Sequence, residues 1–405
     1  MGKSVTIVSL LLTILLTANE CLAEKLRDLI PGLYGGDGIT LAEAPFPRNH
    51  SPHFTIDSAA AINQLNDEIV GEIAALPFGS LESGFALMFD PESGTFVRST
   101  KSLGPLLAER PSTLGRGRFN LGVSFTYYKY NEFEGQDLDN LKVDALHQPD
   151  TLDPADKRTN FELDTVRINL DIDIDVWVLA LNATYGITDR LDVGILVPLV
   201  SVEMDIKARA EIIVSPETPM RTPPIHRFGD ESPDDSASDD AIGLGDIILR
   251  GKYQLLQSDV MDIAGAMLIK LETGDEDNFL GTGDTTVRPL MVAARTFNNV
   301  LGSSISFTPH LNFGFEWNLN ESDESTVEYV LGFDVGNTRW VIAGEFFGSH
   351  ELDRNGIGED ILATSVGAKW NPFDQFVLTA NAMFPLNDEG LRSDLVTTVG
   401  VEYNF

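Results

Sequence analysis

The sequence predicts an all-β fold, an antiparallel transmembrane β-barrel of about 12 strands with an N-terminal hatch-like segment. Three observations support this prediction: a secretory signal at the N-terminus, apolar and polar residues that alternate in repeated segments, and connections that alternate between short and long. After residue 23, no apolar stretch approaches the roughly 20 residues that a membrane-spanning helix needs. Strands are therefore the elements expected to cross the membrane.

The first 23 residues resemble a signal peptide. Lys3 provides the positive charge, residues 5–16 are mostly apolar, and Cys21-Leu22-Ala23 offers a cleavage site after Ala23. A lipoprotein signal at Cys21 is the alternative, but Asn19 and Glu20 stand where such a signal has small residues. Cleavage after Ala23 would remove the one cysteine of the sequence, so the mature chain would have no thiol.

The composition excludes several classes of protein. Hydrophobic residues make up 43% of the 405, too many for a disordered acidic chain. The chain has 62 acidic and 28 basic residues and a net charge of −34, which repels a phosphate backbone. Nucleic acid is therefore not an expected partner.

The barrel is expected within residues 113–405. Phe119, Val123 and Tyr127 alternate with Asn120 and Ser124, as in a strand with one apolar face and one polar face. The expected strands are 117–130, 163–186, 190–212, 245–256, 261–272, 285–297, 303–317, 326–335, 338–349, 360–370, 375–386 and 393–405.

The connections indicate which end of the barrel faces outward. Short links are expected at Thr188-Asp189, Gln257-Ser258, Asn298-Asn299, Gly336-Asn337 and Pro372-Phe373. They alternate with longer links, of which 131–162 and 213–244 are the longest and the most acidic. Bacterial outer-membrane barrels have tight periplasmic turns and long extracellular loops. The sequence thus predicts a Gram-negative outer membrane as the location, with acidic extracellular loops.

The C-terminal strand ends in alternating large residues, Val399, Val401, Tyr403 and Phe405. This pattern resembles the terminal signal that the outer-membrane barrel assembly machinery recognises. An ordinary edge strand that ends in Phe is the alternative. Aromatic residues close to the short turns are expected to form an interfacial girdle; they are Tyr185, Trp340, Trp370 and Tyr403.

Residues 24–112 have a different character, rich in Pro, Gly and Ala. A weak amphipathic helix is expected over 58–76 and a hairpin over 83–100. The arms of this hairpin are too short to span a membrane comfortably, so the segment is expected in the lumen or the periplasm. If the hairpin joined the wall, the barrel would have 14 strands.

Several motifs resemble a known family in their order along the chain. They are Gly104-Pro105-Leu106-Leu107-Ala108-Glu109-Arg110, residues 113–120, Phe133-Glu134-Gly135-Gln136-Asp137-Leu138, Tyr185-Gly186-Ile187-Thr188-Asp189-Arg190-Leu191-Asp192-Val193-Gly194 and Gly243-Leu244-Gly245-Asp246-Ile247. Together they resemble the outer-membrane channel family named for the MetA pathway of phenol degradation. The resemblance implies uptake of aromatic or other hydrophobic compounds and brings no binding residues with it.

If the apolar member of each alternation faces lipid, the other member lines the lumen. The pore-lining candidates are Asp246, Arg250, Lys252, Lys270, His310, Asn312, Glu316, Asp334, Arg339, Glu345, Lys369 and Glu402. Among them, Arg250, Lys252 and Lys270 are expected to form a basic strip that influences ion selectivity. A closed core of mutually paired charges is the alternative.

Two strand registers can be predicted. A two-residue turn at Gly336-Asn337 would place Asp334 opposite Arg339 as an ion pair. In the hairpin 163–212 the apolar residues change phase near Val176 and again near Val200-Ser201. We expect paired bulges there, with Tyr185 opposite Leu191.

The same hairpin gathers Asp171, Asp173, Glu203 and Asp205 on one face. A hydrated acidic face is the simpler interpretation, and a surface divalent cation is the alternative. No other metal or cofactor is expected. Ser349-His350 and the loop residue His226 show no paired base and orienting group, so no enzymatic activity is expected.

The sequence therefore predicts a channel for passive uptake of small hydrophobic or aromatic compounds. The expected partners are this solute, outer-membrane lipid and lipopolysaccharide, and the barrel assembly machinery. A closed structural or surface-interaction barrel is the second hypothesis, and an integral outer-membrane enzyme is the third.

Overall fold

The fold is taken from a computed structural model of the chain. The residues that it describes are 25–33, 39, 41, 87–90, 95–98, 102–146, 164–216, 226–228, 233–258, 260–300, 304–320, 325–352, 360–373 and 375–405. The predicted signal peptide and the predicted helix over 58–76 lie outside these residues.

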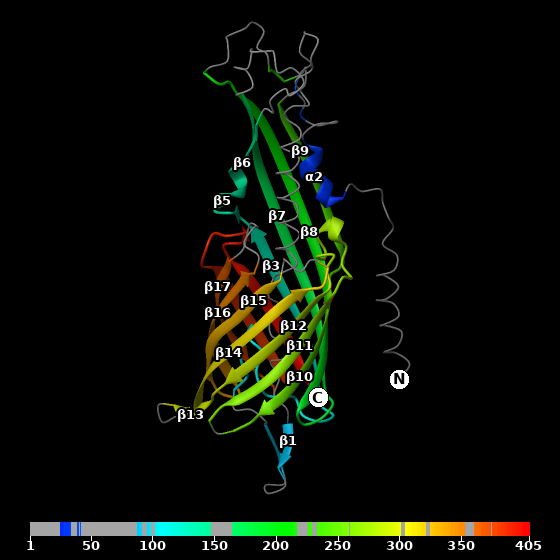
Figure 1. Cartoon of the computed structure of the whole chain (residues 1–405). Coiled ribbons are helices and arrows are strands. Elements are labelled where there is room, and N and C mark those ends of the chain that lie inside the picture. The colour runs from blue at the N-terminus through cyan, green and yellow to red at the C-terminus, as the bar shows by residue number, and fades with distance from the viewer. Residues whose placement is uncertain are drawn as a thin grey trace, which may run out of the picture.

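Within the described residues, twelve antiparallel strands close into a barrel (Figure 1). Their order around the wall is β3-β20-β18-β17-β16-β15-β14-β12-β11-β10-β8-β7, and β7 pairs with β3 to complete the ring. The strands are β3 Phe119–Tyr130, β7 Thr165–Gly186, β8 Leu191–Ile213, β10 Ile247–Leu256, β11 Asp262–Leu271, β12 Thr286–Ala294, β14 Ile305–Asn318, β15 Thr326–Gly336, β16 Trp340–Glu351, β17 Asp360–Trp370, β18 Phe376–Pro385 and β20 Val396–Asn404.

Each predicted barrel strand is confirmed to within a few residues, because alternation along a strand follows directly from its two different surroundings. The outward residues are apolar and exposed all round the wall, including Phe125, Leu249, Met291, Leu331 and Val366. Contiguous apolar surface of this extent would be unstable in water. It fits the hydrocarbon layer of a membrane.

The two ends of the barrel differ. The C-terminus and the short turns lie at the lower end in Figure 1, and the long connections lie at the upper end. Trp340 and Trp370 lie opposite each other beside the short turns, and both are exposed. Phe405 packs against Phe119 and Tyr403 at the same end. These aromatic residues occupy the positions expected of an interfacial girdle.

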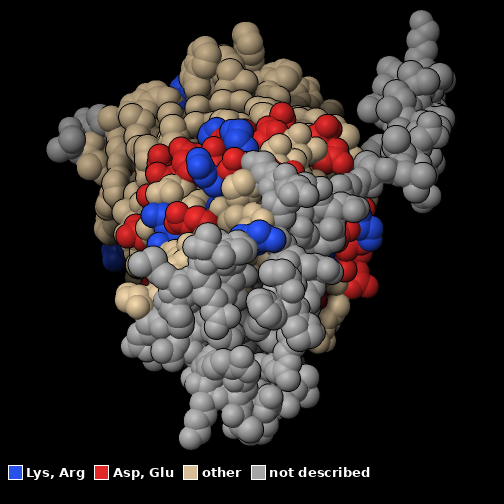
Figure 2. Space-filling model, turned by 90° about the horizontal axis from the view of Figure 1, so that it is seen from above, with Lys and Arg blue, Asp and Glu red and all other residues tan. Residues whose placement is uncertain are grey.

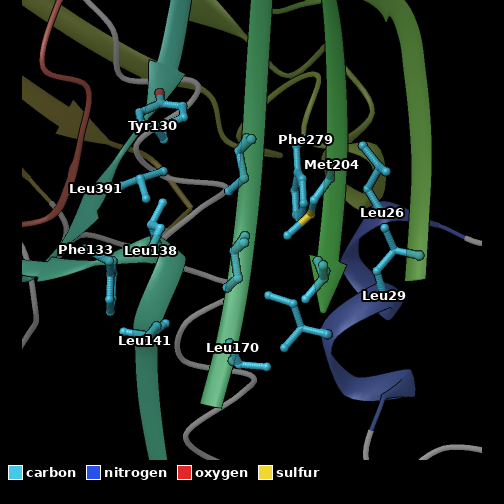
Figure 3. Close-up of a cluster of buried hydrophobic side chains, with 14 of the residues drawn as sticks. Leu26, Leu29, Tyr130, Phe133, Leu138, Leu141, Leu170, Met204, Phe279 and Leu391 are labelled. Carbon is cyan, nitrogen blue, oxygen red and sulfur yellow. The ribbon is translucent and has the colours of Figure 1, made fainter. Parts of the chain in front are cut away.

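At the upper end, β7 and β8 continue beyond the barrel. There they pair with β6 (Leu141–Leu146) and β9 (Asp234–Leu244), so that a four-stranded sheet β6-β7-β8-β9 rises above the wall. Its inner face is a large apolar cluster (Figure 3). The short helix α2 (Leu26–Gly32) covers part of this face with Leu26, Leu29 and Ile30, which are almost fully buried.

The described residues contain further short elements outside the barrel wall. A small sheet is formed by β4 (Glu132–Phe133), β5 (Gln136–Asp137) and β19 (Leu391–Arg392), while β13 (Phe297–Val300) pairs with β14. The 3-10 helices are η1 (Leu138–Asn140) and η3 (Glu276–Asn278). No described helix is long and apolar enough to span a membrane.

The hairpin over 83–100 does not join the wall. Its strands β1 (Leu87–Asp90) and β2 (Thr95–Arg98) pair only with each other among the described strands, and β1 lies below the barrel in Figure 1. The barrel therefore has 12 strands and not 14.

The predicted register of the β7–β8 hairpin is wrong. Tyr185 lies opposite Val193, and the pairing runs from Thr165↔Ile213 to Gly186↔Asp192 without a shift, so the expected bulges are not formed. Even-numbered β7 residues face inward along the whole strand. What changes is the environment, because the inward face borders the lumen below and the apolar cluster above, while the outward face passes from lipid into water.

The predicted turn at Gly336-Asn337 is also wrong. Gly336 pairs with Val341, so the turn is longer and Asp334 lies opposite Ala343. The backbone N–H of Asn337 donates to the carbonyl of Trp340, and the Asn337 side chain accepts from the N–H of Arg339. Arg339 is thus an exposed turn residue and forms no ion pair with Asp334. The link expected at Asn298-Asn299 is likewise longer, because β13 lies within it.

Two connections expected to be simple loops contain strands. Residues 131–162 include β6, and 213–244 include β9, whose sequence Asp-Asp-Ser-Ala-Ser-Asp-Asp has almost no apolar alternation. Most of β9 is exposed or half-buried. Its pairing with β8 stabilises it, and this long-range partner leaves no periodic signal in the strand's own sequence.

Candidate functional site

The candidate site is the lumen of the barrel. Inward-facing residues of the lower wall are polar and include Asn120, Thr184, Asp192, Asp334 and Lys369, all of them buried. Burial of so many polar groups requires partners. Most of these partners come from one segment of the chain, residues 102–118, which we call the luminal loop.

The luminal loop enters the barrel from the short-turn end and returns to it. Ser102 donates to the carboxylate of Asp334, which lies close to the turn after β15. At the other end of the loop, the N–H of Leu114 donates to Asp192 Oδ2 at 2.8 Å, and Thr113 donates to the carbonyl of Asp189 at 2.8 Å. Both ends are therefore fixed at the same side of the barrel.

Glu345 holds the middle of the luminal loop. Its carboxylate accepts the backbone N–H groups of Leu106 at 2.9 Å, Leu107 at 2.7 Å and Ala108 at 3.3 Å. His310 Nε2 lies 3.3 Å from the same carboxylate. An acidic side chain in a β-strand thus replaces the hydrogen bonds that the loop backbone would otherwise make with water.

A buried cluster of charges holds the tip of the loop. Arg250 Nη1 donates to both carboxylate oxygens of Glu109 at 2.7 Å, and Lys252 Nζ lies 3.7 Å from the same carboxylate. Lys252 also donates to the carbonyl of Arg110 at 3.2 Å. The Arg250 and Lys252 side chains are 0% exposed and that of Glu109 is 8% exposed.

Apolar and amide contacts complete this packing. Leu103 and Leu106 pack against the inward-facing residues Val341, Ala343 and Val377. Lys369 donates to the carbonyl of Pro105. The amide of Asn312, oriented to satisfy its neighbours, donates to the carbonyl of Glu109 at 3.0 Å. Gly104 adopts a φ of +84° and Gly115 a φ of +88°, conformations that favour glycine at the bends of the loop.

The predicted pore-lining residues therefore fall into separate groups. One group contacts the luminal loop; it consists of Arg250, Lys252, His310, Asn312, Asp334, Glu345 and Lys369, where His310 acts through Glu345. Glu402 accepts a hydrogen bond from Asn120. Arg339 lies in a turn outside the lumen. Sequence reasoning missed Glu109, because nothing in local spacing shows that a loop residue will meet two distant strands.

Asp246 has a structural partner at the upper end of the wall. Its carboxylate accepts the N–H groups of Thr273, Gly274 and Thr282 at 3.1, 2.9 and 2.8 Å. It therefore shapes the connection between β11 and β12. This connection carries Phe279, which is buried in the apolar cluster above the barrel.

A second set of luminal charges lies on β11, β12, β14 and β15. Arg288 Nε lies 3.2 Å from Glu316 Oε2, and Arg288 Nη1 donates to Glu328. The predicted residues Lys270 and Glu316 belong here, whereas Arg288 and Glu328 were missed. The only sequence signal for Arg288 is its position on the inward face of β12.

Apolar patches lie beside this charged set in the outer half of the lumen. Ala180, Leu196 and Ile248 form a buried cluster with Leu268 packed against it. On the opposite wall, Val330, Phe347, Ala363 and Met383 belong to or pack against the cluster that continues into the upper sheet. A solute that comes from the long-loop end would thus meet apolar patches and the Arg288 set before it reaches the luminal loop.

The long-loop end carries charges of both signs. Figure 2 shows Asp and Glu side chains beside Lys and Arg side chains on this face. Asp173 and Asp205 lie opposite each other, but Lys129 pairs with Asp173 at 2.8 Å and Lys207 with Asp171 at 3.4 Å. No group of three or more potential ligands in the described residues is arranged to hold a metal ion. A divalent cation among Asp171, Asp173, Glu203 and Asp205 stays a prediction.

Two histidine–carboxylate pairs were not predicted. His226 Nδ1 lies 2.7 Å from Asp164 Oδ2, and both side chains are 2% exposed. Asp164, just before β7, also accepts the N–H of Ser215 at 2.8 Å, so it fixes two positions of the connection between β8 and β9. His350 contacts Asp360, but Ser349 points to the opposite face of its strand. Ser349 and His350 therefore do not converge as nucleophile and base.

The sequence profile of a family described as "Putative MetA-pathway of phenol degradation" matches residues 153–392, more than half of the chain. No curated protein matches.

Several solved barrels are similar at low identity. An outer membrane channel from Pseudomonas putida F1 has a TM-score of 0.44 and 13% identity, covering 73% of this chain and 97% of its own. The Ralstonia pickettii toluene transporter TbuX has a TM-score of 0.36 and 12% identity, covering 73% and 92%. The CymD monoaromatic hydrocarbon channel has a TM-score of 0.34 and 10% identity, covering 73% and 91%.

Proposed function

The chain belongs to the family named for the MetA pathway of phenol degradation, and from this premise we propose that it is an outer-membrane channel for passive uptake of small hydrophobic or aromatic compounds. The location would be the outer membrane of a Gram-negative bacterium, after cleavage of the signal peptide. Outer-membrane lipid and lipopolysaccharide would surround the apolar belt. The C-terminal residues Val399, Val401, Tyr403 and Phe405 would be the signal for the barrel assembly machinery.

The observation that supports this proposal best is the distribution of polarity along the lumen. Leu196, Ile248 and Leu268 give one side of the outer half an apolar wall beside the Arg288 set, whereas the inner half is polar and holds the luminal loop. A general pore for sugars or salts has a polar, water-filled interior along its length. An apolar entrance lowers the free energy of a hydrophobic solute relative to water.

The luminal loop is the structural basis of the second hypothesis, a closed barrel with a structural or surface-interaction role. Glu109, Arg250 and Lys252 form a buried ion-pair cluster of the kind that fills the interior of small barrels. Both hypotheses place the protein in the outer membrane. They differ in whether any solute passes.

Solute flux through purified barrel in liposomes separates the two hypotheses. We expect entry of phenol or toluene to exceed that in protein-free liposomes after correction for lipid permeation, and sugars of similar size to enter more slowly. A difference in gel migration between unheated and heated samples would verify that the barrel is folded. Folded barrel that adds no flux of any solute would contradict the channel and favour the closed barrel. An integral enzyme would instead require turnover of a substrate, and no described nucleophile and base converge to support it.

A further inference from the structure

The luminal charges differ in how accessible they are. The side chains of Arg250 and Lys252 are 0% exposed, and those of Glu345 and Asp334 are 0% and 1% exposed. The side chains of Arg288, Glu316 and Glu328 are 26%, 20% and 17% exposed. The luminal loop thus covers the first set, while the second set remains open to an approaching solute.

The accessible set is built across neighbouring strands. Arg288 on β12 reaches Glu316 on β14 and Glu328 on β15. Lys270 on β11 lies opposite Thr286, two residues from Arg288 on the same inward face. Because residues opposite each other in antiparallel strands point to the same side, all four side chains face the outer half of the lumen.

Apolar side chains flank this set. Leu268 lies directly opposite Arg288 in the β11–β12 pair, and the same Leu268 packs against the apolar cluster of Leu196 and Ile248. Leu290 is the next inward residue of β12 after Arg288. Arg288 therefore lies at the border between an apolar wall and a pair of carboxylates.

We propose that Lys270, Arg288, Glu316 and Glu328 form the site that determines which solutes pass, and that it favours uncharged aromatic compounds bearing a hydroxyl group. The inference rests on the proposed channel function and names its substrate class. Two cations and two carboxylates leave the set without net charge, so it attracts neither ion class. A phenolic hydroxyl donates to a carboxylate or accepts from Arg288 while the ring contacts Leu268.

The sign of the remaining charge provides the test. Arg288→Gln leaves two carboxylates against one lysine, so the flux of benzoate relative to phenol should fall several-fold and the reversal potential in a salt gradient should shift toward cations. Glu316→Gln leaves an excess of positive charge and should shift both readouts in the opposite direction. Arg288→Lys keeps the charge and should restore a wild-type reversal potential.

Arg295→Gln is the matched control, because Arg295 is exposed outside the lumen beside Phe297 and its loss changes the net charge of the chain equally. Wild-type flux of phenol with unchanged selectivity in folded Arg288→Gln and Glu316→Gln barrels would overturn the assigned site and leave the channel function standing. Failure of the folded wild-type barrel to pass phenol would overturn both.

Discussion

Glu109 anchors the tip of the luminal loop. Its carboxylate is shared by Arg250 and Lys252, and all three side chains are buried. This carboxylate offsets much of the cost of taking two cations out of water. The loop tip therefore cannot leave its position without exposing both cations to the lumen.

Glu109→Gln should therefore loosen the luminal loop. Removal of one partner from a buried ion pair costs on the order of 3–5 kcal/mol, because it leaves the other charge uncompensated. We expect a lower melting temperature and a larger conductance in planar bilayers. Glu211→Gln, on an exposed position of β8, is the control and should alter neither. Unchanged conductance in a destabilised Glu109→Gln barrel would show that the loop does not restrict passage.

The same contacts change what is expected of Arg250 and Lys252. Their predicted place on the inward face follows from alternation, which the sequence contains. Their burial under Glu109 depends on a segment about 140 residues away in the chain, and no spacing pattern encodes that contact. Glutamine substitutions there should therefore mainly release the loop, whereas selectivity should depend on Arg288.

The attachment of α2 depends on pH through Asp277. Its hydrogen bond and charge interaction with Lys25 hold the pKa of Asp277 below its ordinary value. Since this pKa is lowered by folding, the pair stabilises the attached helix above about pH 4 and is lost as pH falls through the lowered value.

We therefore expect hydrogen exchange of α2 to stay constant between pH 7 and pH 5, after correction for intrinsic exchange rates, and to rise below about pH 4. The effect should be small, because the pair is solvent-exposed and Leu26, Leu29 and Ile30 remain buried. Arg27 Nη1 also lies 3.6 Å from Asp277 Oδ1, so Asp277→Asn is the variant that should remove the acid-dependent part. A pH response that persists in Asp277→Asn would assign it to another group.

At the scale of elements, the β7–β8 hairpin explains both the success and the failure of the sequence predictions. Its two strands were found because apolar residues alternate along them. The phase change near Val176 was interpreted as a bulge, since alternation alone does not distinguish a shifted backbone from a changed environment. β9 was missed for a related reason, because neither of its faces is strongly apolar.

A pair of cysteines can test the register of this hairpin, since the mature chain is expected to have none of its own. In the structure Asp173 lies opposite Asp205, whereas the register predicted from sequence would place Asp173 opposite Glu203. Residues directly opposite are close enough for a disulfide, and diagonal neighbours are about 7–8 Å apart.

We expect Asp173→Cys/Asp205→Cys to form a disulfide on mild oxidation and Asp173→Cys/Glu203→Cys to form little. A change in gel mobility that is reversed by reductant would show that the disulfide has formed. Preferential cross-linking of the second pair would contradict the observed register and support the bulged register predicted from the sequence.

At the scale of the whole molecule, the two ends of the N-terminal region lie on opposite sides of the barrel. α2 contacts the connection between β11 and β12 through Lys25 and Asp277, and Leu41 pairs with Phe228 in the connection between β8 and β9. Both are long connections at the upper end. β1 lies below the lower end, and Ser102 enters the lumen from there (Figure 1).

This arrangement predicts that α2 is displayed on the outside of the cell. A cysteine at the exposed position Asp28 should react with a membrane-impermeant maleimide on intact cells. Asp388→Cys, at the long-loop end, should react as well, and Gln257→Cys, in a short turn, should react only after the cells are lysed. If Asp28→Cys behaves like Gln257→Cys, α2 faces the periplasm and the predicted orientation is wrong.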